Sequence, residues 1–335
     1  MRHQIINVGL IGLGRIGKMH AKNICEKLPL LNLKSIADPK PDLEFIQNLG
    51  GTTLHEDAQE IISDKNIDAV IISSPTPTHF NLIKKCLRNN KHVFCEKPIS
   101  FSENEINEII DLMVIQESFV QVGLNRRFDE EFILLKEKIK EGLIGKTQII
   151  HITNHDSTIP RFKFLKSSGG MLFDLCIHDF DMLTFITGKK IKEIYVNGSV
   201  FIEPRLKDIN DIDNAIITLE LTNGVLCTID SSRQTHFGYD QRIEVFGSKG
   251  MISVDNKPNQ LFLLSDESRT IKSKIKKSFA ERYESSYVHE LEHFYKCIIS
   301  NKSPIVGPKN ILDAIHIATA GTKSLELNRP VMVER

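Results

Sequence analysis

The sequence carries no excess charge of either sign and no long apolar run, and each absence excludes a class of protein. Lysine plus arginine number 43, and aspartate plus glutamate also number 43, so the formal net charge is zero. A neutral chain has no bulk attraction for nucleic acid or for an anionic membrane surface. Since no apolar stretch approaches the roughly 20 residues of a membrane span, we expect no transmembrane helix.

Cysteine is present without the spacing of a metal site or a disulfide framework. The six cysteines form no CxxC pair, and most lie in apolar segments, where a free thiol behaves as a small hydrophobic side chain. The first predicted strand begins near the N-terminus, with no signal-like segment before it. We therefore expect a cytoplasmic protein, and 335 residues suffice for two domains with their own cores.

The first forty residues have the pattern of a dinucleotide-binding unit. A strand, a helix and a second strand are predicted in that order, at 5–11, 18–27 and 33–37. Gly12 permits the tight turn after the strand, Gly14 lets the backbone approach a pyrophosphate, and Gly17 lets the helix pack against the strand. Asp38 ends the second strand, about 20 residues on, where it can accept hydrogen bonds from both ribose hydroxyls.

Asp38 also indicates which dinucleotide is bound. A carboxylate there repels the 2′-phosphate of NADP, which needs a nearby arginine. The next residues are Pro39, Lys40 and Pro41, with no arginine among them. The sequence therefore predicts NAD, although Lys40 leaves some use of NADP open.

Two further polar segments end predicted strands of the same sheet, where ligands bind in such folds. The first is 73–79, and the second is Glu96-Lys97-Pro98. A lysine at a strand end would face the nicotinamide and the substrate, although a surface lysine in a loop is the alternative. The candidate cofactor-binding residues are Gly12, Gly14, Arg15, Ile16, Gly17, Asp38, Ser73, Ser74, Pro75, Thr76, His79, Glu96 and Lys97.

The order of elements predicts two domains. Strands and helices alternate at 68–73, 77–89, 91–95, 103–116, 119–123 and 130–141, with Ser102 and Glu105 set as a capping box. This alternation predicts a parallel, doubly wound α/β Rossmann domain over 1–124. Strands at 146–155, 215–221, 225–230 and 241–246, with a hairpin turn at 222–224, predict an α+β domain. That domain spans 125–335 and has an open, mostly antiparallel sheet; a return of the C-terminal helix to the first domain is left open.

Asp174 and His178 stand one helical turn apart in the apolar segment 169–183. This spacing places the carboxylate and the imidazole on one face of a helix that must be largely buried, with Asp181 continuing the stripe. Burying such groups is costly unless they pair or do chemistry. Two interpretations stay open from the residues alone: a general base oriented by a carboxylate, and a structural pair.

Four motifs resemble the Gfo/Idh/MocA oxidoreductases over nearly the whole chain. They lie at 12–20, 96–98, 125–129 and 169–179. Within that family, the segments around 168–170, 177–182 and 238–250 are most like those of the inositol 2-dehydrogenases. The resemblance implies an enzyme of inositol catabolism that oxidises a ring hydroxyl of myo-inositol to 2-keto-myo-inositol, also called scyllo-inosose, with NAD.

The resemblance also implies a catalytic trio of Lys97, Asp174 and His178. Histidine suits the role of general base because its reference pKa, about 6.5, lies near operating pH. Asp174 would orient the ring of His178 and stabilise its charged form. Lys97 would donate to the reacting oxygen and hold the developing alkoxide.

The polyol-binding residues that the resemblance implies include the trio and four more. The full set is Lys97, Arg127, Asp156, Asp174, His178, Tyr239 and Tyr287. The role of Arg127 stays open between cofactor, substrate and inter-domain pairing, and core packing is the alternative for both tyrosines. Many relatives carry Ser-Arg-Asp-Pro where this chain has Asn-His-Asp-Ser at 154–157, so Asp156 is retained while its neighbours differ.

We expect no bound metal, and we expect the protein to form a homotetramer. His151 and His155 share a face of a predicted strand but lie about 13 Å apart by rise per residue, too far for one ion. Relatives pack their open sheets together into tetramers. The alternative functions are a dehydrogenase acting on scyllo-inositol or another sugar or polyol, and an NAD-sensing regulator without chemistry. The intact trio argues against a regulator.

Overall fold

Residues 4–334 are described by a computed structural model, and the chain divides into two units. The first unit runs to Asn125 and includes Ser285–Leu312; the second holds Arg126–Glu284 and the chain from Asp313. The expected second domain, 125–335, is therefore not continuous. Helix α11 (Glu284–Ser300) belongs largely to the first unit because Leu291 and Phe294 are part of the buried apolar cluster of that unit.

The first unit is built on a six-stranded parallel sheet in the order β3-β2-β1-β4-β5-β6. The strands are β1 (Ile6–Ile11), β2 (Leu31–Ala37), β3 (Thr53–His55), β4 (Ala69–Ile72), β5 (His92–Glu96) and β6 (Val120–Gly123). This is the strand order of dinucleotide-binding folds, with the switch in direction between β1 and β4. The predicted doubly wound α/β domain is confirmed.

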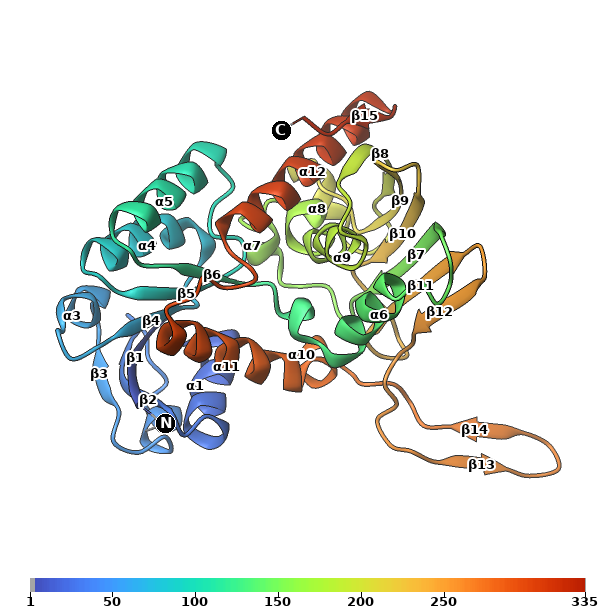
Figure 1. The fold of residues 1–335 in the computed structure, drawn as a ribbon. Helices are drawn as coiled ribbons and strands as arrows, with labels where there is room; N and C mark the ends of the chain where they lie inside the picture. The colour runs from blue at the N-terminus through green and yellow to red at the C-terminus, as the bar shows by residue number, and fades with distance from the viewer. Residues whose placement is uncertain (1–3, 335) are drawn as a thin grey trace. The chain divides into compact units, whose positions relative to one another are not determined.

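Helices cover both faces of this sheet (Figure 1). One face holds α1 (Arg15–Lys27) and α11, and the other holds α3 (Ala58–Ser63), α4 (His79–Arg88) and α5 (Glu103–Ile115). The shorter helices are α2 (Leu43–Gln47) and η1 (Thr76–Thr78). Because both faces are covered, the central strands are apolar throughout, as in β4, where all four residues are buried.

The start of α5 confirms one half of the predicted capping box and corrects the other. The hydroxyl of Ser102 accepts from the backbone N–H of Glu105 at 3.4 Å. The carboxylate of Glu105 does not reach back to Ser102, because it accepts from the hydroxyl of Ser100 at 2.5 Å. Ser100 also accepts from the Ser102 N–H at 2.9 Å, so it fills the place that the box assigns to Glu105.

The second unit is built on a seven-stranded sheet in the order β12-β11-β7-β10-β9-β8-β15. The strands are β7 (Thr147–His155), β8 (Ile191–Ser199), β9 (Asn214–Leu221), β10 (Leu226–Ser232), β11 (Asp240–Gly247), β12 (Gly250–Val254) and β15 (Val331–Met332). Every neighbouring pair is antiparallel except β7 and β10. The predicted mostly antiparallel sheet is confirmed, as is the tight turn at 222–224, where Gly224 has a φ of +84°.

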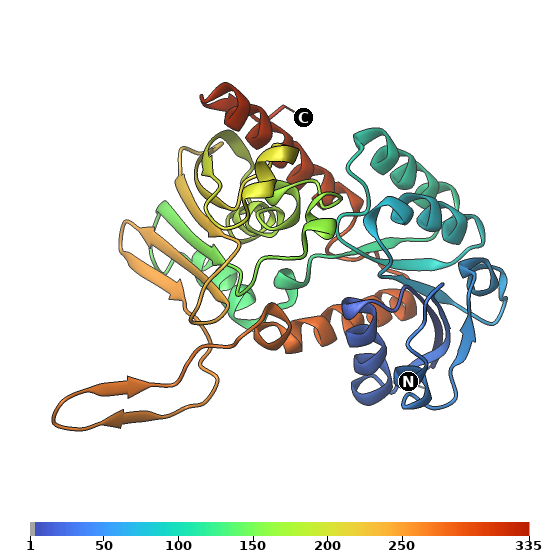
Figure 2. The same cartoon turned by 180° about the vertical axis from the view of Figure 1, so that it is seen from behind.

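Helices pack on one face of this sheet (Figures 1 and 2). They are α6 (Glu130–Lys140), α8 (Met171–Asp174), α9 (Ile177–Thr187) and α12 (Pro308–Leu327). Short helices elsewhere are η2 (Asn125–Phe128), α7 (Phe162–Leu165), η3 (Pro204–Ile209) and α10 (Phe279–Arg282). Side chains alternate along β7, so that Ile150 and Ile152 are buried while Ile149 is 47% exposed on the other face. A hairpin of β13 (Leu263–Ser265) and β14 (Thr270–Lys272) extends away from the sheet.

The apolar segment 169–183 forms two helices instead of the single one predicted. α8 ends at Asp174 and α9 begins at Ile177, with a turn between them. The backbone N–H of Cys176 reaches back to the carbonyl of Met171, one residue further than in an α-helix, which interrupts the regular ladder. Asp174 and His178 therefore lie on successive helices and are half-buried, whereas Asp179 and Asp181 are buried.

The cysteines and the hydrophobic helices are the two remaining features on which the sequence made a prediction. All six cysteines are free thiols, and all but Cys25 are buried. Among the helices formed by residues 4–334, none has both the length and the apolar character that a membrane span needs.

Candidate functional site

The turn after β1 is shaped by glycines whose backbones are in close contact with their surroundings. Gly12 has a φ of +94°, and a Cβ on it would lie 2.5 Å from the backbone nitrogen of Ser74. A Cβ on Gly17 would lie 2.1 Å from the carbonyl oxygen of Gly12. A Cβ on Gly14 would meet nothing within 4 Å. The turn is thus closed on the protein side and open beside Gly14, at the N-terminus of α1, which fits a dinucleotide pyrophosphate.

Asp38 lies at the carboxyl end of β2 and is tied to this turn. One carboxylate oxygen accepts from the backbone N–H of Leu13 at 2.6 Å, and the other accepts from that of Lys40 at 2.8 Å. Each carboxylate oxygen can accept more than one hydrogen bond, so lone pairs remain for two ribose hydroxyls. The position fits the predicted role.

The segment after β4 supports the glycine turn. The hydroxyl of Ser73 donates to the carbonyl of Gly12 at 2.8 Å, and Ser74 and Thr78 join their hydroxyls at 2.6 Å. His79, predicted as a cofactor contact, is buried, and its ring nitrogens lie 2.7 Å from the carbonyl oxygen of Ser74 and 2.8 Å from that of Pro98. Its side chain therefore joins the loops after β4 and β5, and both ring nitrogens are already engaged.

β5 ends at Glu96, and the half-buried Lys97 follows it. The carboxylate of Glu96 contacts Nε2 of His20 at 2.7 Å. His20 lies on α1, three residues after Gly17, and closes the sequence motif that carries the glycines. His20 was not among the predicted site residues, although its place three residues after the last glycine of the motif is a signal that the sequence contains.

In the second unit, the carboxylate of Asp174 is held by an arginine that the sequence did not reveal. Arg233 follows β10, is fully buried, and donates from Nη1 to Asp174 at 3.0 Å. Its Nη2 lies 3.8 Å from a carboxylate oxygen of Asp211. Asp174 is therefore positioned by a buried cation, three residues before α9 begins, and His178 is in the first turn of that helix.

Two buried ion pairs are formed by aspartates of α9, the helix that carries His178. Arg126 donates to Asp179 at 2.5 Å, and Arg127 donates to both carboxylate oxygens of Asp181 at 2.8 and 2.6 Å. Burial raises the pKa of Asp179, and the neighbouring Arg126 opposes that shift. Removing one partner of such a pair typically costs about 3–5 kcal/mol. Arg127 thus pairs within the second unit, and Asp181 is explained by that pairing.

The two predicted tyrosines belong to different units. Tyr239 is 3% exposed, and its hydroxyl accepts from Arg126 at 3.1 Å. Burial raises its pKa to about 12. Tyr287 is on α11 in the first unit, and its ring packs edge-on against that of His20, with centroids 6.0 Å apart. The hydroxyl of Tyr239 and the carboxylate of Asp179 therefore share the buried guanidinium group of Arg126.

Asp156 follows β7 and is half-buried, and the residue before it forms an ion-pair cluster. His155 contacts Asp230 with one ring nitrogen and Asp240 with the other, the latter at 3.4 Å. His151 also approaches Asp230, at 3.3 Å. The two histidines are thus nearer to each other than the predicted 13 Å, because their side chains lean toward one carboxylate on the neighbouring strand.

We expect the stability of the protein to depend on pH through His155. Burial alone would lower the pKa of His155, but hydrogen bonds to Asp230 and Asp240 outweigh burial and raise it to about 9. The contribution is therefore complete below the unfolded value of about 6.5 and is lost as pH rises through 9. The difference in unfolding free energy between the native protein and His155→Gln should fall by about 1–2 kcal/mol between pH 6 and pH 10. Urea unfolding curves of both proteins at pH 6 and pH 10 measure this difference in unfolding free energy. A difference that is the same at both pH values would contradict the raised pKa of His155.

Two family models match the chain. One, described as an oxidoreductase family with an NAD-binding Rossmann fold, matches residues 6–124. The other, described as the GFO/IDH/MocA C-terminal domain, matches residues 132–253.

Individual relatives match over nearly their whole length. A myo-inositol 2-dehydrogenase from Thermotoga maritima is 39% identical over 98% of this chain and 99% of its own. A scyllo-inositol 2-dehydrogenase (NAD(+)) from Bacillus subtilis is 32% identical over 100% of this chain and 98% of its own. The crystal structure of scyllo-inositol dehydrogenase from Lactobacillus casei, with bound NAD(H) and scyllo-inositol, has a TM-score of 0.91 at 28% identity, covering 98% of this chain and 99% of that one.

The glycine turn, Asp38 and the strand order, taken with these matches, define an NAD-dependent dehydrogenase. The chain belongs to the Gfo/Idh/MocA oxidoreductase family, as its motifs predicted.

Proposed function

We propose that this enzyme oxidises a ring hydroxyl of myo-inositol to 2-keto-myo-inositol with NAD. The observation that carries the proposal is the ion pair of Asp174 with the buried Arg233, immediately before the helix that carries His178. It provides an oriented carboxylate four residues before a potential base, in a chain 39% identical to a myo-inositol 2-dehydrogenase.

Each residue of the trio has a role that suits its chemistry. His178 takes the proton of the reacting hydroxyl, and Asp174 stabilises the imidazolium that results. Arg233 holds Asp174 in place, so that its carboxylate does not need to reorganise during the reaction. Lys97 donates to the reacting oxygen as negative charge develops there. NAD, when bound, accepts the hydride from the same carbon.

Among the other candidates for polyol contact, exposure favours Asp156. Its carboxylate is half-buried, whereas Arg127, Tyr239 and Tyr287 are each less than a tenth exposed. Arg127 donates a hydrogen bond to Asp181, and the hydroxyl of Tyr239 accepts one from Arg126. We propose that Asp156 accepts hydrogen bonds from ring hydroxyls, and that Arg127 and Tyr239 shape the part of the site that the second unit supplies. Tyr287 is the candidate that the first unit supplies.

A second candidate substrate is scyllo-inositol, because the Bacillus subtilis relative acts on it and is 32% identical to this chain. A panel of inositol isomers and hexoses, with NAD reduction followed by absorbance, separates the two. The proposal requires the highest kcat/KM for myo-inositol. A higher value for scyllo-inositol would transfer the assignment to that isomer, and activity on hexoses alone would overturn both.

We expect NAD to give a higher kcat/KM than NADP, because the carboxylate of Asp38 repels a 2′-phosphate. Replacing Asp38 by alanine together with Pro39→Arg should narrow or invert the preference for NAD. The ratio of the two kcat/KM values changes about tenfold for each ~1.4 kcal/mol by which the substitutions favour NADP over NAD. Pro39→Arg alone is the control, since it adds the cation but keeps the repulsion. Equal use of both cofactors by the native enzyme would contradict the role of Asp38.

We also propose a homotetramer, supported by the uncovered face of the second sheet. Leu226 on β10, Ile149 on β7 and Phe246 on β11 lie side by side on that face and are 57%, 47% and 47% exposed in the single chain, an unusual position for neighbouring apolar side chains. Light scattering should give four times the chain mass of 38.1 kDa, and Leu226→Glu should reduce it. A monomer at micromolar concentration would show that this face is free in solution.

A further inference from the structure

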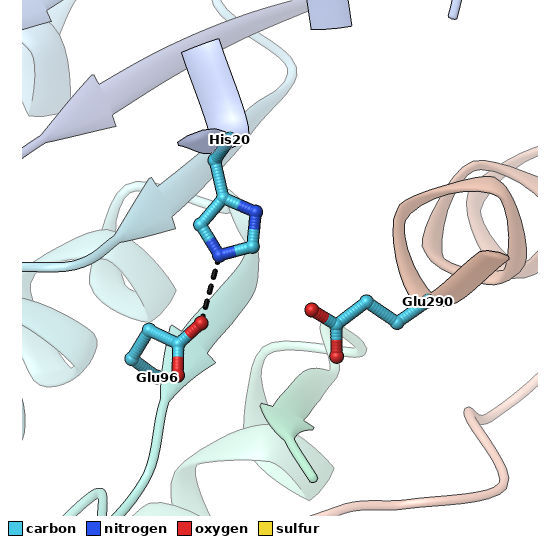
Figure 3. Close-up of side chains that lie close together, drawn as sticks. All are labelled: His20, Glu96 and Glu290. Carbon is cyan, nitrogen blue, oxygen red and sulfur yellow. Dashed lines mark hydrogen bonds and ion pairs between the residues drawn. The ribbon is translucent and has the colours of Figure 1, made fainter. Parts of the chain in front are cut away.

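Three acidic and basic side chains from separate elements of the first unit meet at the end of β5 (Figure 3). His20 comes from α1, Glu96 from the last position of β5, and Glu290 from α11. One nitrogen or oxygen atom of each lies within 4.8 Å of the others. His20 and Glu290 are fully buried, and the side chain of Glu96 is 14% exposed.

In this cluster, His20 and Glu96 are joined by a hydrogen bond, whereas the carboxyl group of Glu290 is not hydrogen-bonded to a described residue. Nε2 of His20 lies 2.7 Å from Glu96, and Figure 3 shows the carboxyl group of Glu290 pointing toward that pair. Among the described residues, neither carboxyl oxygen of Glu290 has a hydrogen-bond partner. A buried carboxylate without a partner is very costly, and such a group takes up a proton instead. Burial raises the pKa of Glu290, and the charge of Glu96 raises it further.

The same three side chains could in principle hold a divalent cation, but the distances favour a proton. Ligand atoms at 2.0–2.2 Å from a tetrahedral ion are about 3.3 Å apart. The His20–Glu96 distance of 2.7 Å is that of a direct hydrogen bond. The cluster is therefore consistent with one negative charge on Glu96, a hydrogen bond from His20, and a protonated Glu290.

We propose that Glu290 is held as a neutral acid within 4.8 Å of Glu96 and His20, and that a small rotation of its side chain lets its hydroxyl donate to the carboxylate of Glu96. Together with the hydrogen bond from His20, this donor forms a frame around Glu96 that positions Lys97. Among the described histidine, cysteine, aspartate and glutamate side chains, those of His20 on α1 and Glu96 on β5 lie within 4.8 Å of Glu290. The neutral side chain of Gln121 on β6 donates to the backbone carbonyl of Glu290 at 2.7 Å. Glu290 and His20 are thus positioning residues, and neither takes part in the chemistry. The inference depends on the role proposed above for Lys97.

The frame can act on Lys97 because the end of β5 has little freedom. Glu96 pairs with Gly123 on β6, and a Cβ on Gly123 would lie 2.9 Å from the carboxylate of Glu96. A side chain at Gly123 would therefore push that carboxylate away from His20. Because Lys97 is the next residue, any displacement of Glu96 is passed on through the backbone.

Kinetics of two Glu290 variants separate a proton-bearing donor from a charged group. Glu290→Leu removes the donor, and we expect kcat to fall by about tenfold, the effect of losing one such hydrogen bond, with little change in the KM for the polyol. Glu290→Gln keeps a donor and cannot ionise, so it should restore kcat to within about threefold of the native value. A glutamine variant as impaired as the leucine variant would overturn the proposal.

Infrared spectroscopy of the native holoenzyme tests the proton directly and needs no substrate. The difference spectrum between the native enzyme and Glu290→Gln should contain the C=O stretch of one protonated carboxylic acid at pH 7. Absence of that band, or one equivalent of tightly bound metal by elemental analysis, would overturn the proposal. Since this readout needs no turnover, an enzyme that shows the band but oxidises no polyol would contradict the proposed function and leave the frame intact.

Discussion

Replacing His178 by alanine is expected to lower kcat for polyol oxidation by a factor of about 10² to 10⁴. Only the neutral imidazole can accept the hydroxyl proton, so oxidation by the native enzyme should become faster as pH rises through the ionisation of this group. The variant should lose that dependence together with the rate. Initial rates of NAD reduction between pH 5 and pH 9 measure both effects.

Two controls make the His178 result specific. NAD binding, followed by calorimetry, should be unchanged in His178→Ala, because the cofactor residues lie in the first unit. Asp174→Asn should keep the fold and slow turnover, because an amide still bonds Arg233 but stabilises an imidazolium less well. If His178→Ala turned over within a few-fold of the native enzyme with the same pH profile, Asp174 and His178 would be a structural pair, and Lys97 would be the next candidate for the base.

The second large effect is expected for Lys97→Ala, which should lose a similar factor in kcat while NAD still binds. Lys97 is proposed to donate to the reacting oxygen, where losing one donor to developing charge typically costs 10² to 10³ in rate. We expect the adenosine half of the cofactor to bind elsewhere, near Asp38 and the glycine turn. Single-turnover rates and NAD titrations separate chemistry from binding.

Lys65→Ala is the matched control, because Lys65 is an exposed lysine of the same unit and should be silent. Lys97→Arg keeps the charge but not the compact ammonium group, so it should recover only part of the rate. Loss of NAD binding in Lys97→Ala, with normal chemistry at saturating NAD, would make Lys97 a cofactor residue only.

The fold was predictable because its local patterns are strong. The glycines at 12, 14 and 17 indicate a dinucleotide turn because they follow a predicted strand, open a helix and precede a second strand that ends at Asp38. Alternating strands and helices, followed by hairpin signals, predicted the class of both sheets, although β3, β8, β12 and β15 were not among the predicted strands. The exception is α11, which is an ordinary amphipathic helix in sequence and gives no local sign of the unit whose core it joins.

The partners of the candidate catalytic residue Asp174 and of the buried Asp179 were not predictable, because they are distant in sequence. Arg233 is 59 residues from Asp174, and Arg126 is 53 from Asp179. A buried arginine in a short polar segment after a strand looks the same as a solvated one until the fold is known. Glu290 was missed for the same reason, since one glutamate on a helix with other polar residues carries no signal of burial.

Side-chain direction limited the predictions that used spacing alone. The distance along β7 separated His151 from His155, yet both rings reach Asp230 on β10. The spacing of four residues predicted that Asp174 and His178 lie one turn apart on a single helix, but α8 ends at Asp174 and α9 begins at Ile177. Spacing fixes where a residue's backbone lies, and packing decides where its side chain goes.

The most direct measurement of the central claim follows the transferred hydrogen. The enzyme would be supplied with NAD and myo-inositol carrying deuterium on the carbon whose hydroxyl becomes the ketone, and the products would be analysed by NMR. The account predicts one deuterium on the reduced nicotinamide for each 2-keto-myo-inositol formed, and neither product with His178→Ala on the same timescale. Reduced nicotinamide without deuterium, or a ketone at another ring carbon, would contradict it.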